Sequence, residues 1–153
     1  GKGNLWAGTA PRGKVLRIAP DGKSTEMLNL NGGSEIADGN ARFVLSLAVS
    51  ADGTVFAGTG PEGKIWRIDP DGKKRELCTL PAPCVSSLLA GSDGRLYAGT
   101  AEEGSVYRID PATGATTILF DTSQSVITGL ARDQEGSLYA ACAPGGEIWR
   151  IQA

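Results

Sequence analysis

The stretch that decides the fold is Gly53-Thr-Val-Phe-Ala-Gly-Thr-Gly-Pro-Glu-Gly-Lys-Ile-Trp-Arg-Ile-Asp-Pro-Asp-Gly72. Residues 55–59 and 64–69 are short runs rich in β-branched and aromatic residues, and the Gly-Pro-Glu-Gly between them has the composition of a tight turn. Asp71-Gly72 marks a second turn. The stretch therefore predicts a β-hairpin that ends in a further turn.

The hairpin recurs along the chain, beginning at Gly3, Gly53, Gly94 and Gly136, with separations of 50, 41 and 42 residues. A period near 42 residues with several short strands in each unit is typical of a β-propeller. No stretch keeps a 3.6-residue apolar period long enough to form a helix. The sequence predicts an all-β fold, a β-propeller of four-stranded antiparallel blades.

Each unit is expected to hold four strands, named a to d from the ring axis outward. The b strands carry one large aromatic residue followed by small residues, in segments 5–9, 55–59, 96–100 and 138–142. The c strands are segments 15–18, 65–68, 106–109 and 148–151, with apolar residues on both faces. Because blades pack face to face, we expect a bulky ring on one blade to lie opposite a small residue on the next.

The inner and outer strands are incomplete in number. Strand a is predicted at 44–49, 85–90 and 127–132, and strand d at 25–30, 75–80 and 116–120. The order is b-c-d, a-b-c-d, a-b-c-d, a-b-c, which gives about 3.5 blades in one propeller segment over residues 1–153, with repeats at about 3–42, 43–83, 84–125 and 126–153. We expect a part of a larger ring, completed by residues or another chain outside this sequence. Self-assembly of further copies is the alternative.

The composition limits the partners. Lys and Arg number 15 against 17 Asp and Glu, a net charge of -2, which argues against a nucleic-acid partner. No apolar run approaches the ~20 residues of a membrane span, so no membrane insertion is expected. Neither a signal peptide nor any other feature fixes the localisation. Of the three cysteines, Cys78 and Cys84 would pair only if their strands bring them together. We favour three small buried residues.

Catalytic and metal chemistry finds little support. The chain has no histidine, which excludes Ser-His-Asp and Cys-His arrangements and the H-E-x-x-H zinc site. The cysteine spacing fits no zinc site. Gly58-Thr-Gly-Pro-Glu-Gly63 matches G-x-G-x-x-G, but it joins two strands, whereas a dinucleotide-binding turn leads from a strand into a helix. The sequence therefore predicts no catalytic residue, no metal and no cofactor.

The candidate binding residues lie where the repeats differ. An insertion of nine residues separates strand d of the first repeat from strand a of the second, and in a propeller this connection shares a face with the b-to-c turns. The candidates from both are Glu35, Asp38, Asn40, Arg12, Glu62, Glu102, Glu103 and Glu147. Their carboxylates could hold Ca²⁺, but Arg12, Lys14 and Lys64 make the same rim charge-mixed, which favours solvated turn charges.

One charged residue type occupies the same place in every c strand: Arg17, Arg67, Arg108 and Arg150. A residue that every blade needs is expected to serve packing between blades, with its stem on a neighbouring aromatic ring and its guanidinium on a carboxylate or carbonyl. Trp66, Tyr107 and Trp149 precede three of these arginines and are predicted to be structural too. Asp69 and Asp110 are the candidate carboxylate partners.

Val85-Ser-Ser-Leu-Leu-Ala-Gly-Ser-Asp-Gly-Arg-Leu-Tyr-Ala-Gly-Thr100, with Leu45-Ser-Leu-Ala-Val-Ser-Ala-Asp-Gly53 as a second copy, resembles bacterial β-propeller repeats of the two-component-regulator family. The segments are also similar to WD40-like and NHL repeats, although the Trp-Asp ending of WD40 blades is missing, since Trp66 and Trp149 are followed by Arg. The resemblance covers nearly the whole chain. It implies a sensing or ligand-binding propeller outside the cytoplasm, within a larger protein.

Three functions are open. The leading hypothesis is a non-catalytic repeat module that presents a ligand- or protein-binding face, as the sensing or scaffold part of a larger bacterial protein. The alternative is a metal-dependent hydrolase similar to the lactonase propellers, whose sites use Glu, Asn and Asp; no residue here matches their motif. The third is a structural or engineered propeller fragment without activity.

Overall fold

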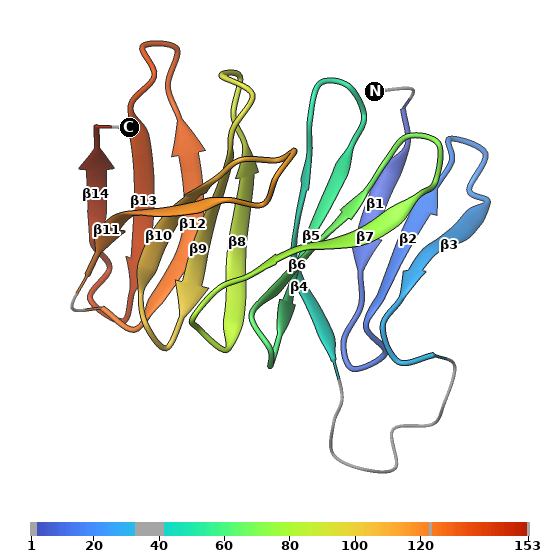
Figure 1. Cartoon of the computed structure of the whole chain (residues 1–153), viewed down its shortest axis with the longest axis horizontal. Coiled ribbons are helices and arrows are strands. Elements are labelled where there is room, and N and C mark those ends of the chain that lie inside the picture. The colour runs from blue at the N-terminus through green and yellow to red at the C-terminus, as the bar shows by residue number, and fades with distance from the viewer. Residues whose placement is uncertain (1–2, 33–41, 123, 153) are drawn as a thin grey trace.

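A computed structural model describes residues 3–32, 42–122 and 124–152. These residues form fourteen β-strands and no helix, in antiparallel sheets (Figure 1). The first blade holds β1 (Leu5–Gly8), β2 (Lys14–Ile18) and β3 (Ser24–Asn29). The second holds β4 (Phe43–Val49), β5 (Val55–Gly60), β6 (Lys64–Ile68) and β7 (Lys74–Thr79). The third holds β8 (Cys84–Ala90), β9 (Leu96–Ala101), β10 (Ser105–Ile109) and β11 (Thr116–Asp121), and the fourth holds β12 (Val126–Arg132), β13 (Leu138–Ala143) and β14 (Ile148–Ile151). The predicted order of strands is confirmed.

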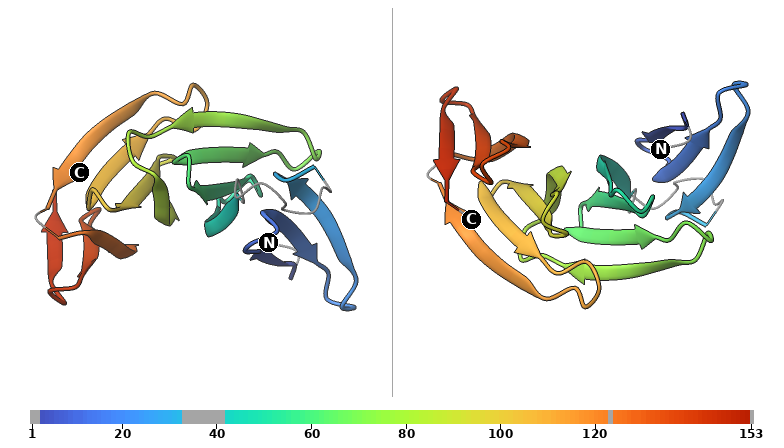
Figure 2. Two further views of the ribbon diagram at one scale, coloured as in Figure 1. Left: turned by 90° about the horizontal axis from the view of Figure 1, so that it is seen from below. Right: turned by 90° about the horizontal axis from the view of Figure 1, so that it is seen from above.

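The blades stand side by side in an open arc (Figure 2). The inner strands β4, β8 and β12 line its concave side, and the outer strands β3, β7 and β11 lie on its convex side. Within each blade, strands that follow one another in the sequence pair with one another; a single bridge between Val126 and Ala101 also joins the third blade to the fourth. The first and fourth blades form the two ends of the arc.

The hairpin over residues 53–72 forms as its composition predicts. In β5 and β6, Val55 pairs with Ile68 and Gly58 pairs with Ile65. After β6 the chain turns at Asp71-Gly72, where the Asp71 carboxylate accepts a hydrogen bond from the backbone N–H of Lys73 (3.0 Å). Gly72 has φ +88°, a left-handed conformation that glycine adopts without steric cost. The turn residues therefore fix where β7 begins.

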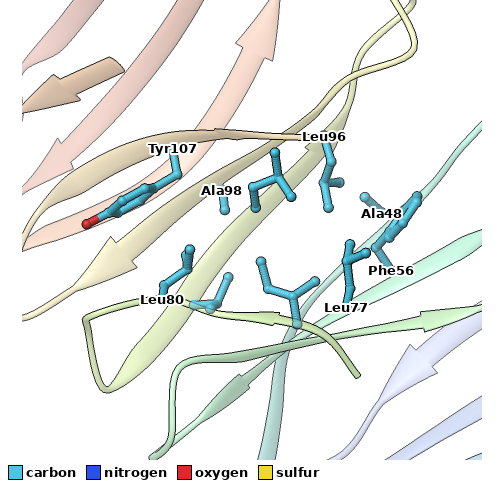
Figure 3. Close-up of a cluster of buried hydrophobic side chains, with 10 residues drawn as sticks. Ala48, Phe56, Leu77, Leu80, Leu96, Ala98 and Tyr107 are labelled. Atoms are coloured by element: carbon cyan, nitrogen blue, oxygen red, sulfur yellow. The ribbon is translucent and has the colours of Figure 1, made fainter. Parts of the chain in front are cut away.

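The blades are held together by a hydrophobic cluster between each pair of neighbours. Figure 3 shows the cluster between the second and third blades, where Phe56 and Leu77 on one blade lie against Leu96, Ala98 and Tyr107 on the other. Burying a side chain of this size contributes about 1.5–3 kcal/mol. Packing between blades therefore contributes substantially to stability.

In the first three blades a glycine of the b strand, Gly8, Gly58 or Gly99, faces the inner strand of the next blade. A Cβ on Gly58 would lie 2.6 Å from a Val85 methyl carbon, and a Cβ on Gly99 would lie 2.4 Å from one of Ile127. The expected packing of small residues against bulky ones therefore occurs, but the bulky partner of these glycines is a β-branched aliphatic residue and not an aromatic ring. Close approach of the inner strand requires the missing side chain.

A β-bulge recurs in the outer strands. The register of β6 against β7 shifts between Ile65 and Trp66, which leaves Leu77 as an extra residue in β7. Met27 in β3 and Leu119 in β11 stand at the matching shifts. All three are apolar residues of the clusters between blades. In a regular strand, side chains point alternately to the two faces of the sheet. The extra residue of the bulge interrupts this alternation, and its side chain packs in the cluster between blades.

Candidate functional site

The b-to-c turns and the d-to-a connections form one face of the arc, at the lower edge in Figure 1. We call it the connection face. Turn and connection are hydrogen-bonded to each other: the backbone N–H of Gly63 donates to the carbonyl of Pro83 (2.7 Å), and that of Leu80 donates to the carbonyl of Gly63 (2.9 Å). In the third blade Thr122 donates to Gly104 in the same way (3.3 Å). The turns are therefore held at fixed positions.

Glycine is required where turn and connection meet. A Cβ on Gly63 would lie 1.9 Å from the carbonyl oxygen of Ala82, and a Cβ on Gly104 would lie 1.8 Å from that of Gln124. Both glycines have φ +61°. No other residue fits this contact, so each of these turns keeps a glycine where it meets the connection.

The sequence-predicted candidates are spread over this face. Arg12, Glu102 and Glu103 are exposed at the turns of the first and third blades. Glu147 lies at the start of the last c strand, where its carboxylate accepts a hydrogen bond from Nε1 of Trp149 (2.9 Å). Three further candidates are in the insertion and lie outside the described residues: Glu35, Asp38 and Asn40.

Glu62 is the candidate that the structure places in a cluster of charges. Its carboxylate lies 3.0 Å from the Arg42 guanidinium and 3.0 Å from the Lys64 ammonium, and Lys64 also lies 3.4 Å from Glu76. Hydrogen bonds from Arg42 and then from Lys64 lower the pKa of Glu62. Arg42 directly precedes β4, and Glu62 lies in the turn between β5 and β6. The ion pair between them therefore links these two segments of the connection face.

This cluster borders a groove of about 410 Å³ between the first and second blades. Apolar side chains of Leu28 and Trp66 line it together with the charges of Arg42, Lys64 and Glu76. Arg42 and Glu76 are absent from the sequence-predicted candidates. The sequence contains a signal for the ion pair: Arg42 and Glu62 have opposite charges and lie on segments that a propeller places on one face.

A second groove lies on the opposite face, between the second and third blades, with a volume of about 280 Å³. Phe56 and Leu96 supply apolar surface, and Asp52, Arg67 and Arg95 supply charge. A hydrogen bond from the Ser50 hydroxyl is the main cause that lowers the pKa of Asp52. Arg67 was expected to be structural, and no sequence pattern indicates this groove, because it depends on how the side chains of two blades pack.

The four repeated arginines have different surroundings. Arg67 donates from Nε to Asp69 (2.7 Å) and from its terminal nitrogen to the carbonyl of Pro111 in the third blade (2.6 Å), and so links two blades. Arg150 donates to the Ser137 hydroxyl (2.8 and 3.1 Å). Arg108 lines a third hollow together with Arg95 and Thr117, and Arg17 is partly buried. Asp110 pairs with Arg95 (2.6 Å) and not with Arg108.

The aromatic residues of the c strands contact the preceding blade. Trp66 packs in the cluster between the first two blades, and Tyr107 is buried in the cluster between the next two. The ring of Trp149 lies 5.3 Å from that of Phe120, measured between centroids. Trp66 and Tyr107 therefore pack toward the preceding blade, and Trp149 lies against Phe120 in β11 of the third blade.

All three cysteines are free; Cys142 is buried as expected, whereas Cys78 and Cys84 are only partly buried. Burial raises the pKa of the Cys78 thiol to about 11, which keeps the thiol protonated and a weak nucleophile at neutral pH. Burial also raises the pKa of Cys84 and of Cys142. Among the residues that the structure describes, no three Asp, Glu or Cys side chains are grouped so as to hold a metal ion.

Glu102 has a backbone conformation that is unusual for its residue type. It has φ +74°, whereas the corresponding residues Pro11, Pro61 and Pro144 follow cis peptide bonds. A left-handed conformation costs a non-glycine residue about 1–2 kcal/mol. We expect Glu102→Gly to raise the free energy of unfolding by about 1 kcal/mol in urea denaturation. A matched Glu103→Gly variant should not gain stability; equal gains would contradict the assignment of strain to Glu102.

Comparison with known proteins gives a family and a fold. The profile of the family described as "Repeat of unknown function (DUF6923)" matches residues 3–142. No curated protein sequence matches the chain. The part of the chain that the structure describes contains no helix long and apolar enough to cross a membrane.

Solved structures share the fold at low sequence identity. Virginiamycin B lyase from Staphylococcus aureus is 22% identical with a TM-score of 0.70, and the match covers 98% of this chain and 52% of that one. The extracellular domain of the putative one component system BT4673 from B. thetaiotaomicron is 19% identical, with a TM-score of 0.71 and coverage of 97% and 20%. A chain of a nidogen/laminin complex is 16% identical, with a TM-score of 0.74 and coverage of 93% and 53%. The chain thus spans about half the length of these structures, or less.

Proposed function

We propose that this chain, which belongs to the DUF6923 family of repeats of unknown function, is a non-catalytic module that presents its connection face to a protein partner. The observation that carries the proposal is a contrast between the repeats. Most side chains that pack blade on blade are alike in the repeats, but one position of the b-to-c turn holds Arg12, Glu62, Glu103 and Gly145 in turn. Because the turn backbones are fixed, this variation changes the face without changing the fold.

The charges on this face favour a polypeptide partner. The exposed turn residue is positive on the first blade and negative on the third, and the groove beside Glu62 has paired charges around an apolar floor. Charges of both signs around an apolar patch are typical of the rim of a protein interface. A partner with a negative charge facing Arg12 and a positive charge facing Glu103 would bind in one orientation only.

Two similar structures support this choice by analogy. The nidogen/laminin complex and the mitotic checkpoint complex each contain a chain with this fold in an assembly of proteins. A third, the BT4673 domain, is the extracellular part of a signalling protein. We infer a comparable sensing or scaffold role, as part of a larger bacterial protein. Fold similarity alone does not carry activity across, so the proposal depends on the face itself.

Charge reversal on the connection face tests the proposal. Peptides would be selected against the immobilised chain from a phage-displayed random library, and their affinities measured for two variants of unchanged net charge. We expect Arg12→Glu/Glu103→Lys to weaken binding about tenfold, because two rim contacts become repulsive. Both residues are exposed and neither is needed for packing. Fluorescence anisotropy with labelled peptides gives the dissociation constants.

Lys23→Glu/Glu135→Lys is the matched control, because both residues are exposed on turns of the opposite face and the net charge is again unchanged. It should leave the affinities within twofold. Peptides that lose affinity in the control and keep it in the connection-face variant would contradict the proposal. A large rise in melting temperature with Ca²⁺, reversed by EDTA, would favour the metal-dependent hydrolase instead.

A further inference from the structure

Two neighbouring junctions between blades differ at the last residue of the inner strand. Ala90 in β8 and Arg132 in β12 are equivalent, because they pair with Leu96 and Leu138 at the same point of their b strands. Ala90 packs against the cluster between the second and third blades, whereas Arg132 reaches back over the ring of Tyr97 in the third blade. The two junctions can therefore be compared position by position.

Between the third and fourth blades, two groups of the third blade hold the Arg132 guanidinium. Its central carbon lies 5.6 Å from the centroid of the Tyr97 ring, within the range of a cation–π contact. One terminal nitrogen lies 2.8 Å from Oδ2 of Asp93, and the same oxygen accepts a hydrogen bond from the Tyr97 hydroxyl (2.6 Å). The Arg132 side chain is only 16% exposed. A ring and a carboxylate of one blade thus bind a guanidinium that comes from the next blade.

The same ring position and carboxylate occur between the second and third blades, without the arginine. Phe56 corresponds to Tyr97, since each pairs with the repeated arginine of its c strand. Asp52 corresponds to Asp93, and each accepts a hydrogen bond from the backbone N–H two residues further on (3.0 and 3.1 Å). Phe56, Asp52 and Ala90 all line the groove of about 280 Å³ at this junction. The short side chain of Ala90 is what leaves this space.

The charges around the groove leave one carboxylate for a cation. Arg67 and Arg95 line it too, but Arg67 lies 2.7 Å from Asp69 and Arg95 lies 2.6 Å from Asp110. Within the residues that the structure describes, no lysine or arginine forms an ion pair with Asp52. The groove therefore combines an aromatic side chain with a negative charge that the chain itself does not neutralise by an ion pair.

The neighbouring junction shows that the repeated arginine tolerates a second guanidinium beside it. Arg108 is the equivalent of Arg67 in the third blade. Burial raises the pKa of Tyr97, whereas the positive charges of Arg132 and Arg108 both lower it, so both guanidinium groups lie near this residue. Arg67 is therefore no obstacle to a cation in the groove.

We propose that the groove between the second and third blades binds a guanidinium group on an alkyl stem, beside the Phe56 ring and with its N–H groups on the Asp52 carboxylate. A guanidinium suits these groups better than an ammonium, because it is planar, weakly hydrated and able to donate from two nitrogens to one carboxylate. Its source would be a small molecule or an arginine side chain of a polypeptide. The groove is on the face opposite the connection face, so the proposal does not rest on the proposed function.

Propylguanidinium, which is the side chain of arginine without its backbone, is the probe that tests the site. Added to the isotope-labelled chain at constant chloride concentration, it should shift the amide NMR signals of residues 50–54 and 90–95. The shifts should saturate with a dissociation constant on the order of 1–10 mM, as expected for one ion pair and one ring contact. Propylurea has a similar shape but no charge and should give no saturable shift. Propylammonium should bind several-fold more weakly.

The peptide Gly-Arg-Gly, titrated in the same way, distinguishes the two sources of the group. Tighter binding of the peptide than of propylguanidinium would assign the site to an arginine of a polypeptide. Weaker binding of the peptide would assign it to a small molecule. Failure of both to bind would overturn the proposal.

Removing the charge of Asp52 is the first test by substitution. Asp52→Asn keeps an oxygen that can accept the hydrogen bonds of the turn, so the variant should fold and bind propylguanidinium about tenfold more weakly. Asp71→Asn is the matched control, because the Asp71 carboxylate makes the same turn contact on the same face but does not line the groove. Its dissociation constant should stay within twofold of the wild type. Equal losses in the two variants would contradict a site at Asp52.

Converting the neighbouring junction into a second site is the sharper test. Arg132→Ala/Tyr97→Phe leaves Asp93 beside a phenylalanine ring without its guanidinium, so this variant should bind a second equivalent of propylguanidinium. New shifts should appear at residues 132–137, and the dispersion of the amide signals checks that the variant is folded. A folded variant that still binds one equivalent would contradict the assigned chemistry.

Ala90→Arg makes the opposite change and should place a guanidinium of the chain in the groove. Binding of propylguanidinium at residues 50–54 should then be lost. The proposal would be overturned if the wild-type chain gave no saturable shift there up to about 50 mM probe, or if binding survived both Ala90→Arg and Asp52→Asn unchanged.

Discussion

Replacing Gly104 by alanine is expected to lower the free energy of unfolding by about 2–5 kcal/mol. The new Cβ would lie 1.8 Å from the carbonyl oxygen of Gln124, so the turn or the β11–β12 connection must move. Such overpacking costs about 1–3 kcal/mol. The residue also has φ +61°, which costs alanine about 1–2 kcal/mol more. Urea denaturation followed by tryptophan fluorescence measures the change.

Gly146→Ala is the matched control for this prediction. Gly146 is in the equivalent turn of the fourth blade and has φ +68°, but nothing lies within 4 Å of its Cβ position. Only the conformational cost of about 1–2 kcal/mol should therefore appear. Equal losses for the two variants would show that contact between turn and connection does not matter.

Gly99→Ala is expected to lower the free energy of unfolding by about 2–3 kcal/mol, because the added methyl group overpacks the contact between the third and fourth blades. Its Cβ would lie 2.4 Å from a methyl carbon of Ile127 and 2.4 Å from the hydroxyl oxygen of Ser87. Ile127→Ala alone should cost about 2–5 kcal/mol, because it leaves a cavity at a fully buried position. The double variant should cost at least about 1 kcal/mol less than the two losses added together, because each change relieves the other.

Ala141→Gly provides the reference for the Gly99 series. The residue occupies the same position in the fourth blade, and its replacement should change the free energy of unfolding by no more than about 1 kcal/mol. Strict additivity of Gly99→Ala and Ile127→Ala, measured by the same denaturation experiment, would refute the contact between glycine and the inner strand.

The strands were predictable because the same hairpin pattern occurs four times in the sequence. One copy of the hairpin, over residues 53–72, indicates two strands and two turns. Comparison with the other three copies shows which positions vary between repeats. The order b-c-d, a-b-c-d, a-b-c-d, a-b-c follows from the spacing and is confirmed by the sheets. Local turn chemistry, as at Asp71-Gly72, sets the boundaries closely.

The packing between blades was predictable only in outline. A small residue after an aromatic one indicates a close contact, but nothing in strand b tells whether a ring or an aliphatic side chain fills the space. The bulges at Met27, Leu77 and Leu119 were not predicted either. Each is an extra residue in an apolar run, and a run of alternating residues gives no sign of where the register shifts.

The candidate site was predictable as a face and not as a set of contacts. The turns carrying Arg12, Glu62 and Glu103 lie on the connection face, where propeller topology puts them. The ion pair between Arg42 and Glu62 depends on side-chain conformations across two segments 20 residues apart, which spacing alone does not give. The groove beside this ion pair depends on the same side-chain conformations, because Arg42 and Glu62 both line it.

Hydrogen exchange measured by mass spectrometry, with and without a selected peptide, tests most directly whether the connection face is the binding surface. We expect the bound peptide to slow exchange in the turns at 60–63 and 101–104, whose backbones lie on this face. Exchange in the turns at 50–54 and 91–95, on the opposite face, should stay unchanged. Slower exchange confined to the second pair of turns would contradict a binding module that uses the connection face.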